Sequence, residues 1–231
     1  MHVVDAFIFD LDGVITDTAE FHYLAWKDCA AGLGITINRE FNETLKGISR
    51  IDSLERILAL GGRHDDFSLE EKHVIANQKN DDYVKLIQKI SPIDLLPGVE
   101  DFLKSISDKG HKIAMASASK NALDVSRLLG IEHYFDHIVD AATITNSKPH
   151  PEVFLRAAEA VGVLPQNCIG IEDAAAGVDA ILAAGMFAVG IGPRDVLGAA
   201  HVVLESTAQL NFDEILSKYR SEKYRSGASG A

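Results

Sequence analysis

The stretch Phe9-Asp10-Leu11-Asp12-Gly13 decides how this 231-residue chain is interpreted, because it directly follows an apolar run. The run at residues 3–9 is too short for a typical helix and suits a strand buried in a parallel sheet. Ligands of open α/β sheets bind beyond the carboxyl ends of the strands, so Asp10 and Asp12 lie where a ligand-binding or catalytic site is expected. The same pattern also fits an ordinary solvated turn, and its interpretation depends on the rest of the chain.

The composition is that of a globular protein with an acidic surface. Apolar residues make up 47% of the chain, charged residues make up 24%, and the formal net charge is −12. A negative surface repels nucleic acids and anionic membranes, so neither is expected as a partner. We expect a monomer that binds a small molecule, and an anionic substrate would need a local cationic pocket.

Several features of the sequence indicate a cytoplasmic protein. Cys29 and Cys168 are the only cysteines and form no Cys-x-x-Cys pair, so neither a disulfide framework nor a zinc site is expected. The amino terminus has no basic segment, and Asp5 interrupts its apolar run, so it is not a secretory signal. Residues 174–192 are apolar, but glycines interrupt them and their periodicity changes, which predicts a core helix and a core strand.

The order of the predicted elements indicates an α/β fold. Residues 18–91 show helical patterns only, with capping-box spacing at Ser68 and Glu71. From residue 92 onward, predicted helices alternate with apolar strands, which is typical of a parallel sheet wrapped by helices. We therefore expect a Rossmann-like core of residues 1–17 and 92–220, a helical cap domain of residues 18–91 inserted after the first strand, and a loose tail of residues 221–231.

The boundaries of the core elements follow from this alternation. The predicted helices span 98–109, 121–129, 151–161 and 175–184, and the predicted strands after the first span 112–116, 136–139, 167–171, 187–191 and 201–204. In a parallel sheet the carboxyl ends of these strands lie along one edge, so polar residues that follow different strands are brought together.

Candidate phosphate-binding residues follow the second predicted strand. In Ser117-Ala118-Ser119-Lys120-Asn121, hydroxyls, amides at a helix start and an ammonium could hold a phosphate. A Ser or Asn helix cap is the simpler alternative. Further on, Pro149 and Pro151 restrict the backbone beside Lys148, and an ammonium fixed there would offset the repulsion between a carboxylate and a phosphate.

The acidic pair Glu172-Asp173 follows the predicted strand 167–171. Together with Asp10, these carboxylates could hold Mg²⁺, which prefers a few carboxylate oxygens and several waters. An isolated acidic pair is more often a charge pair at a helix start. The candidate metal site therefore depends on the two strands ending side by side.

These motifs, in this order and each at a strand end, resemble the haloacid dehalogenase superfamily of phosphatases and phosphomutases over residues 3–205. The resemblance implies that Asp10 attacks phosphorus to form an aspartyl phosphate and that Asp12 is the general acid and base. It also implies that Mg²⁺ is held by Asp10, Asp12, Glu172 and Asp173. Because Asp12 must carry a proton when it acts as an acid, we expect a closing cap to exclude water from it.

The predicted cap resembles that of the sugar phosphomutases in this superfamily, which interconvert β-glucose 1-phosphate and glucose 6-phosphate through an aspartyl phosphate and glucose 1,6-bisphosphate. The likeness implies that Arg50 binds the phosphate distal to Asp10, that Lys46 and Gly47 face the sugar, and that Thr18 lies at the hinge. The residues expected to bind phosphate or substrate are His22, Trp26, Lys46, Gly47, Arg50, Ser53, Lys79, Ser117, Ala118, Ser119, Asn121 and Lys148.

Other interpretations of the cap and of the function stay open at this level. His22 and Trp26 share one helical face and could belong to the core of the cap, and Lys46, Arg50 and Lys79 could be solvated charges. A phosphatase of a small sugar phosphate would have the same core residues, with water as the acceptor. A non-catalytic sugar-phosphate sensor is a further alternative, because a fold does not determine a function.

Overall fold

A six-stranded sheet forms the centre of the computed structural model, which describes residues 4–228. The strand order is β3-β2-β1-β4-β5-β6, and every neighbouring pair is parallel. The expected α/β fold with a Rossmann-like core is thus confirmed. The strands are β1 (Ala6–Phe9), β2 (Lys112–Met115), β3 (His137–Ile138), β4 (Cys168–Glu172), β5 (Phe187–Ile191) and β6 (Val202–Leu204).

The central strand β1 is buried on both faces. Phe7 and Phe9 point into one apolar cluster, whereas Ala6 and Ile8 point into another on the opposite face. A strand covered on both sides has no polar alternation, which is why the apolar run reads as continuous. Since β2 and β4 pair with β1 on either side, the residues that follow these three strands meet at one edge of the sheet.

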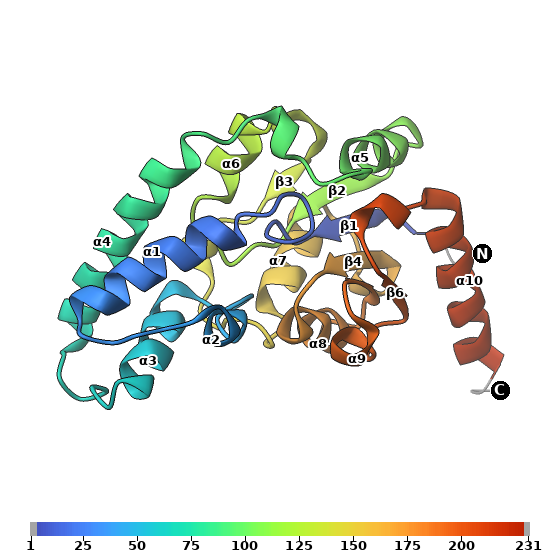
Figure 1. The fold of residues 1–231 in the computed structure, drawn as a ribbon. Coiled ribbons are helices and arrows are strands. Elements are labelled where there is room, and N and C mark those ends of the chain that lie inside the picture. Colours follow the sequence, from blue (N-terminus) through green and yellow to red (C-terminus); the bar gives the residue numbers. More distant parts are fainter. Residues whose placement is uncertain (1–3, 229–231) are drawn as a thin grey trace.

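Helices cover both faces of the sheet (Figure 1). One face carries α5 (Val99–Asp108), α6 (Ala122–Leu128) and α10 (Phe212–Ala228), and the other carries α7 (Glu152–Ala160), α8 (Ala175–Ala183) and α9 (Arg194–Leu197). Short 3-10 turns occupy Pro92–Asp94, Glu132–Tyr134, Ala141–Thr143, Pro165–Asn167 and Thr207–Gln209. The apolar residues of 174–192 form α8 and β5, as predicted, and no helix within residues 4–228 has the length and apolarity to cross a membrane.

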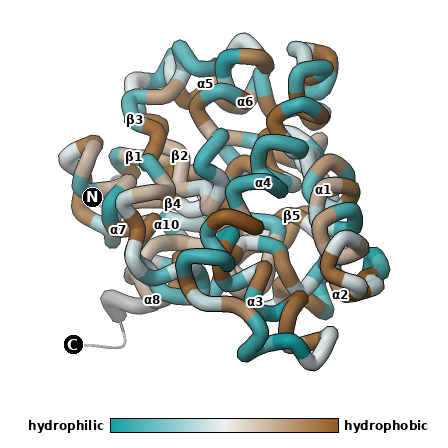
Figure 2. Tube along the Cα trace, turned by 90° about the vertical axis from the view of Figure 1, so that its left-hand side faces the viewer, coloured by the Kyte–Doolittle hydropathy of each residue, from teal (hydrophilic) through white to brown (hydrophobic). Residues whose placement is uncertain are grey.

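Four helices lie between β1 and β2 in the sequence and form what we call the cap: α1 (Ala19–Gly32), α2 (Arg39–Glu43), α3 (Arg50–Leu60) and α4 (Leu69–Ile87). They pack around an apolar cluster of their own, which includes Trp26, Leu54 and Ile57. The capping box predicted at Ser68 and Glu71 is present at the start of α4. Figure 2 views the molecule from the cap side, with α4 in front. The cap is the helical insertion that the sequence predicts, and its exact boundaries stay a prediction.

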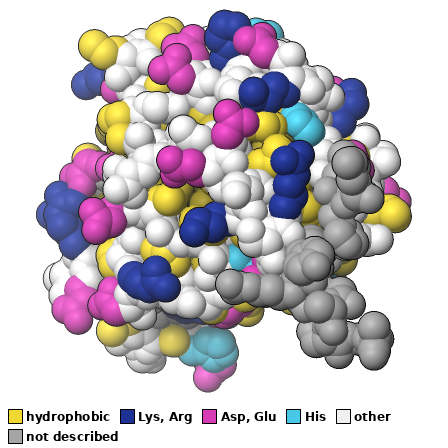
Figure 3. All heavy atoms as spheres, turned by 90° about the vertical axis from the view of Figure 1, so that its right-hand side faces the viewer, with side chains coloured by type: hydrophobic (Ala, Val, Ile, Leu, Met, Phe, Trp, Pro, Cys, Tyr) yellow, Lys and Arg dark blue, Asp and Glu magenta, His cyan; other side chains and the backbone are white. Residues whose placement is uncertain are grey.

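The carboxyl-terminal segment differs from the sequence prediction. Helix α10 continues to Ala228, so residues 221–228 are helical and do not form a loose tail; residues 229–231 lie outside the described part of the chain. Phe212, Ile215 and Tyr219 anchor the helix on the core, and the Tyr219 hydroxyl donates to the carbonyl of Gln166 at 2.8 Å. Lysine, arginine and glutamate are good helix formers and prolong an anchored helix. Figure 3 shows basic and acidic side chains interspersed on the face of the molecule near α10.

Candidate active site

Asp10 and Asp12 lie on the turn that follows β1. The Asp10 N–H donates to the carbonyl of Ile171 at 3.0 Å, which extends the pairing of β1 with β4 and fixes the backbone of Asp10. Gly13 has a φ of 79°, and a Cβ on it would lie 2.2 Å from Oδ2 of Asp173. Glycine is required here both for the turn and for the approach of Asp173. Asp10 is 5% exposed, so its carboxylate is held almost out of water.

Lys148 contacts carboxylates at the ends of two neighbouring strands, β1 and β4. Its Nζ donates to Oδ1 of Asp10 at 2.7 Å and to Oε1 of Glu172 at 2.6 Å, and the residue is 2% exposed. Burial by itself would lower the pKa of the ammonium, but the charges of Asp10 and Glu172 outweigh it and raise that pKa above its ordinary value. Lys148 is therefore a permanently charged, immobile cation beside Asp10.

Asp10, Glu172 and Asp173 form a carboxylate cluster in which each residue offers an oxygen within 4.8 Å of the others. Burial, helped by the charges of Glu172 and Asp10, raises the pKa of Asp173 well above its ordinary value. Burial also raises the pKa of Glu172, although Lys148 opposes this. Three crowded carboxylates, which among the described residues are contacted only by the ammonium groups of Lys148 and Lys46, leave negative charge to be neutralised. A divalent cation that binds hard oxygen ligands fits this cluster.

The carboxylate of Asp12, which the sequence also predicted as a metal ligand, lies outside this group of three. Its side chain is 29% exposed, and its Oδ1 is buried without a hydrogen-bond partner among the residues that the structure describes. Burial, together with the nearby charge of Asp10, raises the pKa of Asp12 to about 7. A carboxyl group with this pKa can both give and take a proton near neutral pH.

The cap brings His22 and Lys79 close to Asp12. Nζ of Lys79 lies 3.0 Å from Nδ1 of His22, and Nε2 of His22 lies 3.9 Å from Oδ2 of Asp12. Burial and the charge of Lys79 lower the pKa of His22 well below its ordinary value, so the ring is neutral. When Lys79 is protonated its ammonium can only donate, so Nδ1 then accepts and the ring proton sits on Nε2, toward Asp12. Trp26 is buried in the cap core and its ring also contacts the Lys79 ammonium, 4.5 Å away.

Replacing Lys79 with Met is expected to stabilise the protein near pH 7 and to change its stability little near pH 10. Burial, together with the charge of Arg50, lowers the pKa of Lys79 from 10.5 to about 7. Between these values the unfolded chain binds a proton that the folded protein lacks, so wild-type stability should rise with pH in this range. The Met variant should lack this slope and exceed the wild type near pH 7 by on the order of 3 kcal/mol.

Urea unfolding of both proteins at several pH values between neutral and alkaline measures this difference. The matched control is Lys85→Met on the same helix, because the Lys85 side chain is 71% exposed and pairs with Asp82 in solvent. The control should keep the pH slope of the wild type. Equal slopes in the wild type and the Lys79→Met variant would contradict the lowered pKa of Lys79.

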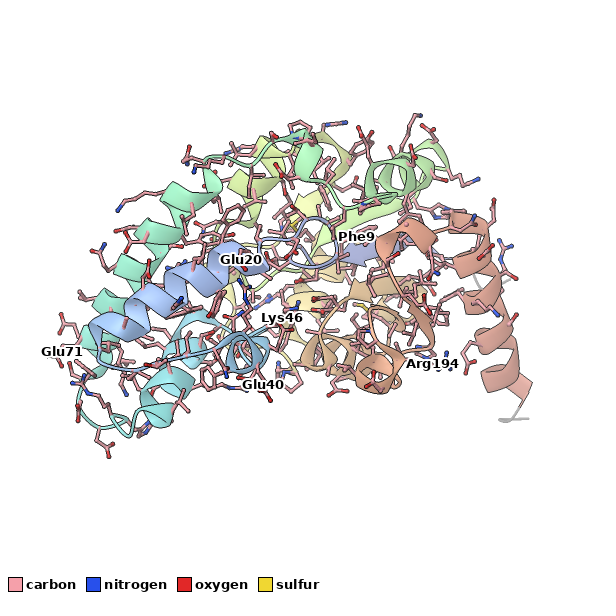
Figure 4. All side chains as sticks on the ribbon, viewed as in Figure 1. Phe9, Glu20, Glu40, Lys46, Glu71 and Arg194 are labelled. Carbon is pink, nitrogen blue, oxygen red and sulfur yellow. The ribbon has the colours of Figure 1, made fainter. Side chains whose placement is uncertain are left out.

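Lys46 and Gly47 bring the cap onto the core. Figure 4 labels the side chain of Lys46, which lies where the cap meets the core. Its Nζ lies 3.4 Å from Oδ2 of Asp173 and 2.9 Å from Oε2 of Glu43. A Cβ on Gly47 would lie 3.6 Å from the Lys148 side chain. Lys46 was expected to face the sugar. It lines the same cavity, but its ammonium contacts the carboxylate cluster.

The segment that follows β2 presents hydrogen-bond donors at the other end of the cavity. Oγ of Ser117 accepts from the N–H of Ser119 at 3.0 Å, and Oγ of Ser119 accepts from the N–H of Asn121 at 3.2 Å, so both hydroxyl hydrogens point elsewhere. The side chain of Asn121 makes no capping bond to α6. Its Nδ2 donates to Oδ1 of Asn80 in the cap at 2.7 Å. The helix-cap alternative thus does not account for Asn121.

Arg50 approaches this segment from the start of α3. Its two terminal nitrogens donate to Oδ1 of Asn80 at 2.8 Å and to Oδ1 of Asn77 at 3.3 Å. No carboxylate within residues 4–228 forms an ion pair with this guanidinium, whose pKa is lowered by burial. Ser53 lies one turn further along α3, and its hydroxyl donates to the carbonyl of Ser49. A half-buried cation without an ion-pair partner among the described residues is suited to an anionic ligand.

One cavity between the cap and the sheet edge connects these groups. Its walls include Asp10, Asp12, His22, Trp26, Lys46, Gly47, Arg50, Ser53, Lys79, Ala118, Ser119, Asn121 and Asp173. Ser117 and Lys148 line an adjoining cavity that shares Arg50 with the first. Thr18, the expected hinge residue, is fully buried directly before α1 and lines neither of these cavities, so its hinge role stays a prediction.

The comparison with known proteins agrees with this geometry. The model of the haloacid dehalogenase-like hydrolases matches residues 4–185. The chain belongs to this family. Over 220 residues it is 46% identical to a protein of Bacillus subtilis named β-phosphoglucomutase, covering 95% of this chain and 96% of that one. The resemblance predicted from the strand-end motifs is thus confirmed.

Two other relatives bear on the type of enzyme. The crystal structure of a β-phosphoglucomutase from Clostridium difficile has a TM-score of 0.95 to this chain and 52% sequence identity, and covers 96% of this chain and all of its own. A fructose-1-phosphate phosphatase of Escherichia coli is 32% identical over 80% of this chain and 94% of its own length. The identity to the β-phosphoglucomutases of Bacillus subtilis and Clostridium difficile is higher than the identity to this phosphatase, which supports a phosphomutase over a phosphatase.

Two cavity residues of this family member were not found by sequence reasoning. Asn80 and Asn42 both line the cavity, and neither was among the predicted site residues. Asn80 follows Lys79 directly in α4, but an isolated asparagine in a helix carries no recognisable pattern. Only the packing of α4 against α3 and the core brings its side chain to Arg50 and Asn121.

Proposed function

We propose that this protein is a β-phosphoglucomutase, which interconverts β-D-glucose 1-phosphate and D-glucose 6-phosphate through a phosphorylated Asp10 and glucose 1,6-bisphosphate. One observation carries the proposal: two separate cationic groups serve the cavity, with Lys148 contacting Asp10 from an adjoining cavity and Arg50 lying with Asn121 in the cavity wall. A phosphatase needs only the first of these. A mutase must bind a sugar phosphate in two orientations, with one phosphate at each end.

Asp10 and Asp12 share the chemistry between them. An oxygen of Asp10 attacks phosphorus, the bond to the sugar oxygen breaks, and Asp12 gives its proton to that oxygen. In the second half-reaction a sugar hydroxyl oxygen attacks the phosphorus of the phosphoaspartate, and Asp12 takes the proton of that hydroxyl. The pKa of Asp12, about 7, suits both directions near neutral pH. Lys148 stays charged throughout and offsets the negative charge of the phosphoryl oxygens.

We propose Mg²⁺ as the metal of this site, held by Asp10, Glu172 and Asp173. The donors are hard carboxylate oxygens, and the missing side chain at Gly13 leaves room beside Asp173. When bound, the cation would neutralise charge on the transferring phosphoryl group. The carboxylate of Asp12, which lies near His22, does not bind the metal in this proposal and transfers the proton instead.

The cap supports transfer to a sugar over transfer to water. His22 and Lys79 lie close to Asp12, and Lys46 reaches Asp173, so the closed cap covers both the acid and the carboxylate cluster. A covered site excludes water from a reactive phosphoaspartate. We infer that the second substrate phosphate, bound at Arg50 and Asn121, favours this closed arrangement.

Incubation with Mg²⁺, β-glucose 1-phosphate and a trace of glucose 1,6-bisphosphate tests the proposal. Glucose 6-phosphate should accumulate, and it should not accumulate when a chelator replaces Mg²⁺. Release of inorganic phosphate in proportion to the substrate consumed would instead identify a phosphatase. The same assay with other β-sugar 1-phosphates would define the preferred sugar.

Replacing Arg50 with Ala should lower kcat/KM for β-glucose 1-phosphate by about 100-fold, because charge-assisted hydrogen bonds to one phosphate are lost. Hydrolysis of p-nitrophenyl phosphate, which has no second phosphate, should change by less than about two-fold. The matched control is Arg56→Ala: Arg56 also lies on α3 but donates to the carbonyl of Thr44, outside the cavity. Equal loss of both activities in Arg50→Ala would contradict a role at a second phosphate.

A further inference from the structure

We propose that Asn80 is a positioning residue that holds Arg50 of the cap and Asn121 of the core together. Both side chains then point their hydrogen-bond donors at the same phosphate group. The inference rests on the proposed function, because it concerns the phosphate-binding end of the same cavity. Asn80 lies within α4, and its side chain is the point at which α3, α4 and the segment before α6 meet. No sequence motif or resemblance assigned a role to it.

One oxygen atom makes this junction. Oδ1 of Asn80 accepts from a terminal nitrogen of Arg50 at 2.8 Å and from Nδ2 of Asn121 at 2.7 Å. Arg50 and Asn121 belong to the cap and to the core respectively, and 41 residues separate Asn121 from Asn80. A single carbonyl oxygen, with two lone pairs, therefore sets the distance between the two phosphate-binding candidates.

The same contacts determine which end of the Asn121 amide faces Asn80. Arginine only donates hydrogen bonds, so the Asn80 atom that meets Arg50 must be its oxygen. The Asn121 group that meets the same oxygen must then be its NH₂. A phosphate oxygen accepts hydrogen bonds, so Asn121 presents the group that a phosphate requires. Without Asn80, the amide of Asn121 would be free to turn its oxygen toward the ligand.

The neutrality of Asn80 matters as much as its oxygen. Arg50 is half-buried and has no carboxylate partner within residues 4–228, so its charge stays available to an anion. A carboxylate at position 80 would keep both hydrogen bonds but would neutralise Arg50 and repel a phosphate. An amide provides the acceptor without the charge.

Asn77 offers a matched comparison on the same helix. Its Oδ1 accepts from the other terminal nitrogen of Arg50 at 3.3 Å, three residues before Asn80. However, no hydrogen bond among the described side chains connects Asn77 to the core. Loss of a contact with Arg50 can thus be separated from loss of the link between Arg50 and Asn121.

Binding of glucose 6-phosphate, measured by titration calorimetry, tests the proposal. Asn80→Ala should weaken binding about ten-fold, which corresponds to the loss of one to two hydrogen bonds. Asn80→Asp, which keeps size and acceptor, should weaken it at least as much because of its charge. Asn77→Ala should bind within about two-fold of the wild type, and thermal unfolding should show that all three variants fold. A merely structural role for Asn80 predicts instead that Asn80→Asp binds normally.

A double-mutant cycle and a second substrate complete the test. If Asn80 acts through Asn121, the loss in Asn80→Ala/Asn121→Ala should be smaller than the two single losses combined. Asn80→Ala should lower the hydrolysis of p-nitrophenyl phosphate by a smaller factor than the turnover of β-glucose 1-phosphate. Unchanged affinity in Asn80→Ala, or fully additive losses, would overturn the inference. Because binding is measured without turnover, a protein that binds the sugar phosphate but does not isomerise it would refute only the proposed function.

Discussion

Replacing Asp10 with Asn is expected to lower kcat for β-glucose 1-phosphate by at least about 10⁴-fold, because an amide cannot serve as the nucleophile. The substitution preserves the size of the side chain. Lys148 keeps its second carboxylate partner, Glu172, at 2.6 Å, so the fold should be retained. The loss should therefore come from the chemistry and not from unfolding.

Initial rates and the mass of the intact protein both measure this effect. After incubation with glucose 1,6-bisphosphate, the wild type should gain one phosphoryl group, whereas the variant should gain none. The matched control is Asp5→Asn at the amino end of the same strand, where the Asp5 carboxylate accepts from Asn167. This control should keep wild-type activity within about two-fold. An Asp10→Asn variant that is still phosphorylated would exclude Asp10 as the nucleophile.

Replacing Lys148 with Met is expected to cost about 3–5 kcal/mol of unfolding free energy and most of the activity. The ammonium is the shared partner of Asp10 and Glu172, which are 5% and 0% exposed. Its removal leaves two buried carboxylates without that counter-charge, and the pKa of Glu172, which Lys148 holds down against burial, should rise further. The folded protein should then bind protons that the unfolded chain does not bind, so the loss of stability should shrink as the pH falls.

Urea unfolding near pH 5 and near pH 8 measures this pH dependence. Added Mg²⁺ should restore part of the stability at pH 8, because a cation bound by the folded state replaces the lost charge. The matched control is Lys104→Met, which removes an exposed ion pair with Asp108 and should change stability by less than about 1 kcal/mol. A Lys148→Met variant with a pH-independent loss of stability would mean that the two carboxylates do not depend on the ammonium.

Much of the fold and half of the candidate site followed from local patterns. The apolar run before Asp10 and the alternation after residue 92 predict parallel strands, and parallel strands end at one edge. That rule alone brings Asp10 and the pair Glu172-Asp173 together, although Glu172 lies 162 positions after Asp10 in the sequence. The carboxyl-terminal helix α10 was not predicted, and its polar last residues were taken for a loose tail, because only the packing of its first turns on the core shows that a helix starts there.

The sequence by itself determined the chemistry of the core: a carboxylate after β1, a lysine and an acidic pair after neighbouring strands, all placed by strand periodicity and chain order. Only the tertiary structure decided how the cap completes it. Lys46 meets Asp173 across 127 residues and Asn80 meets Asn121 across 41, and no local pattern encodes either contact. The physical reason is that a strand places its end residues through short-range geometry, whereas a contact between two packed bodies depends on every side chain at their interface.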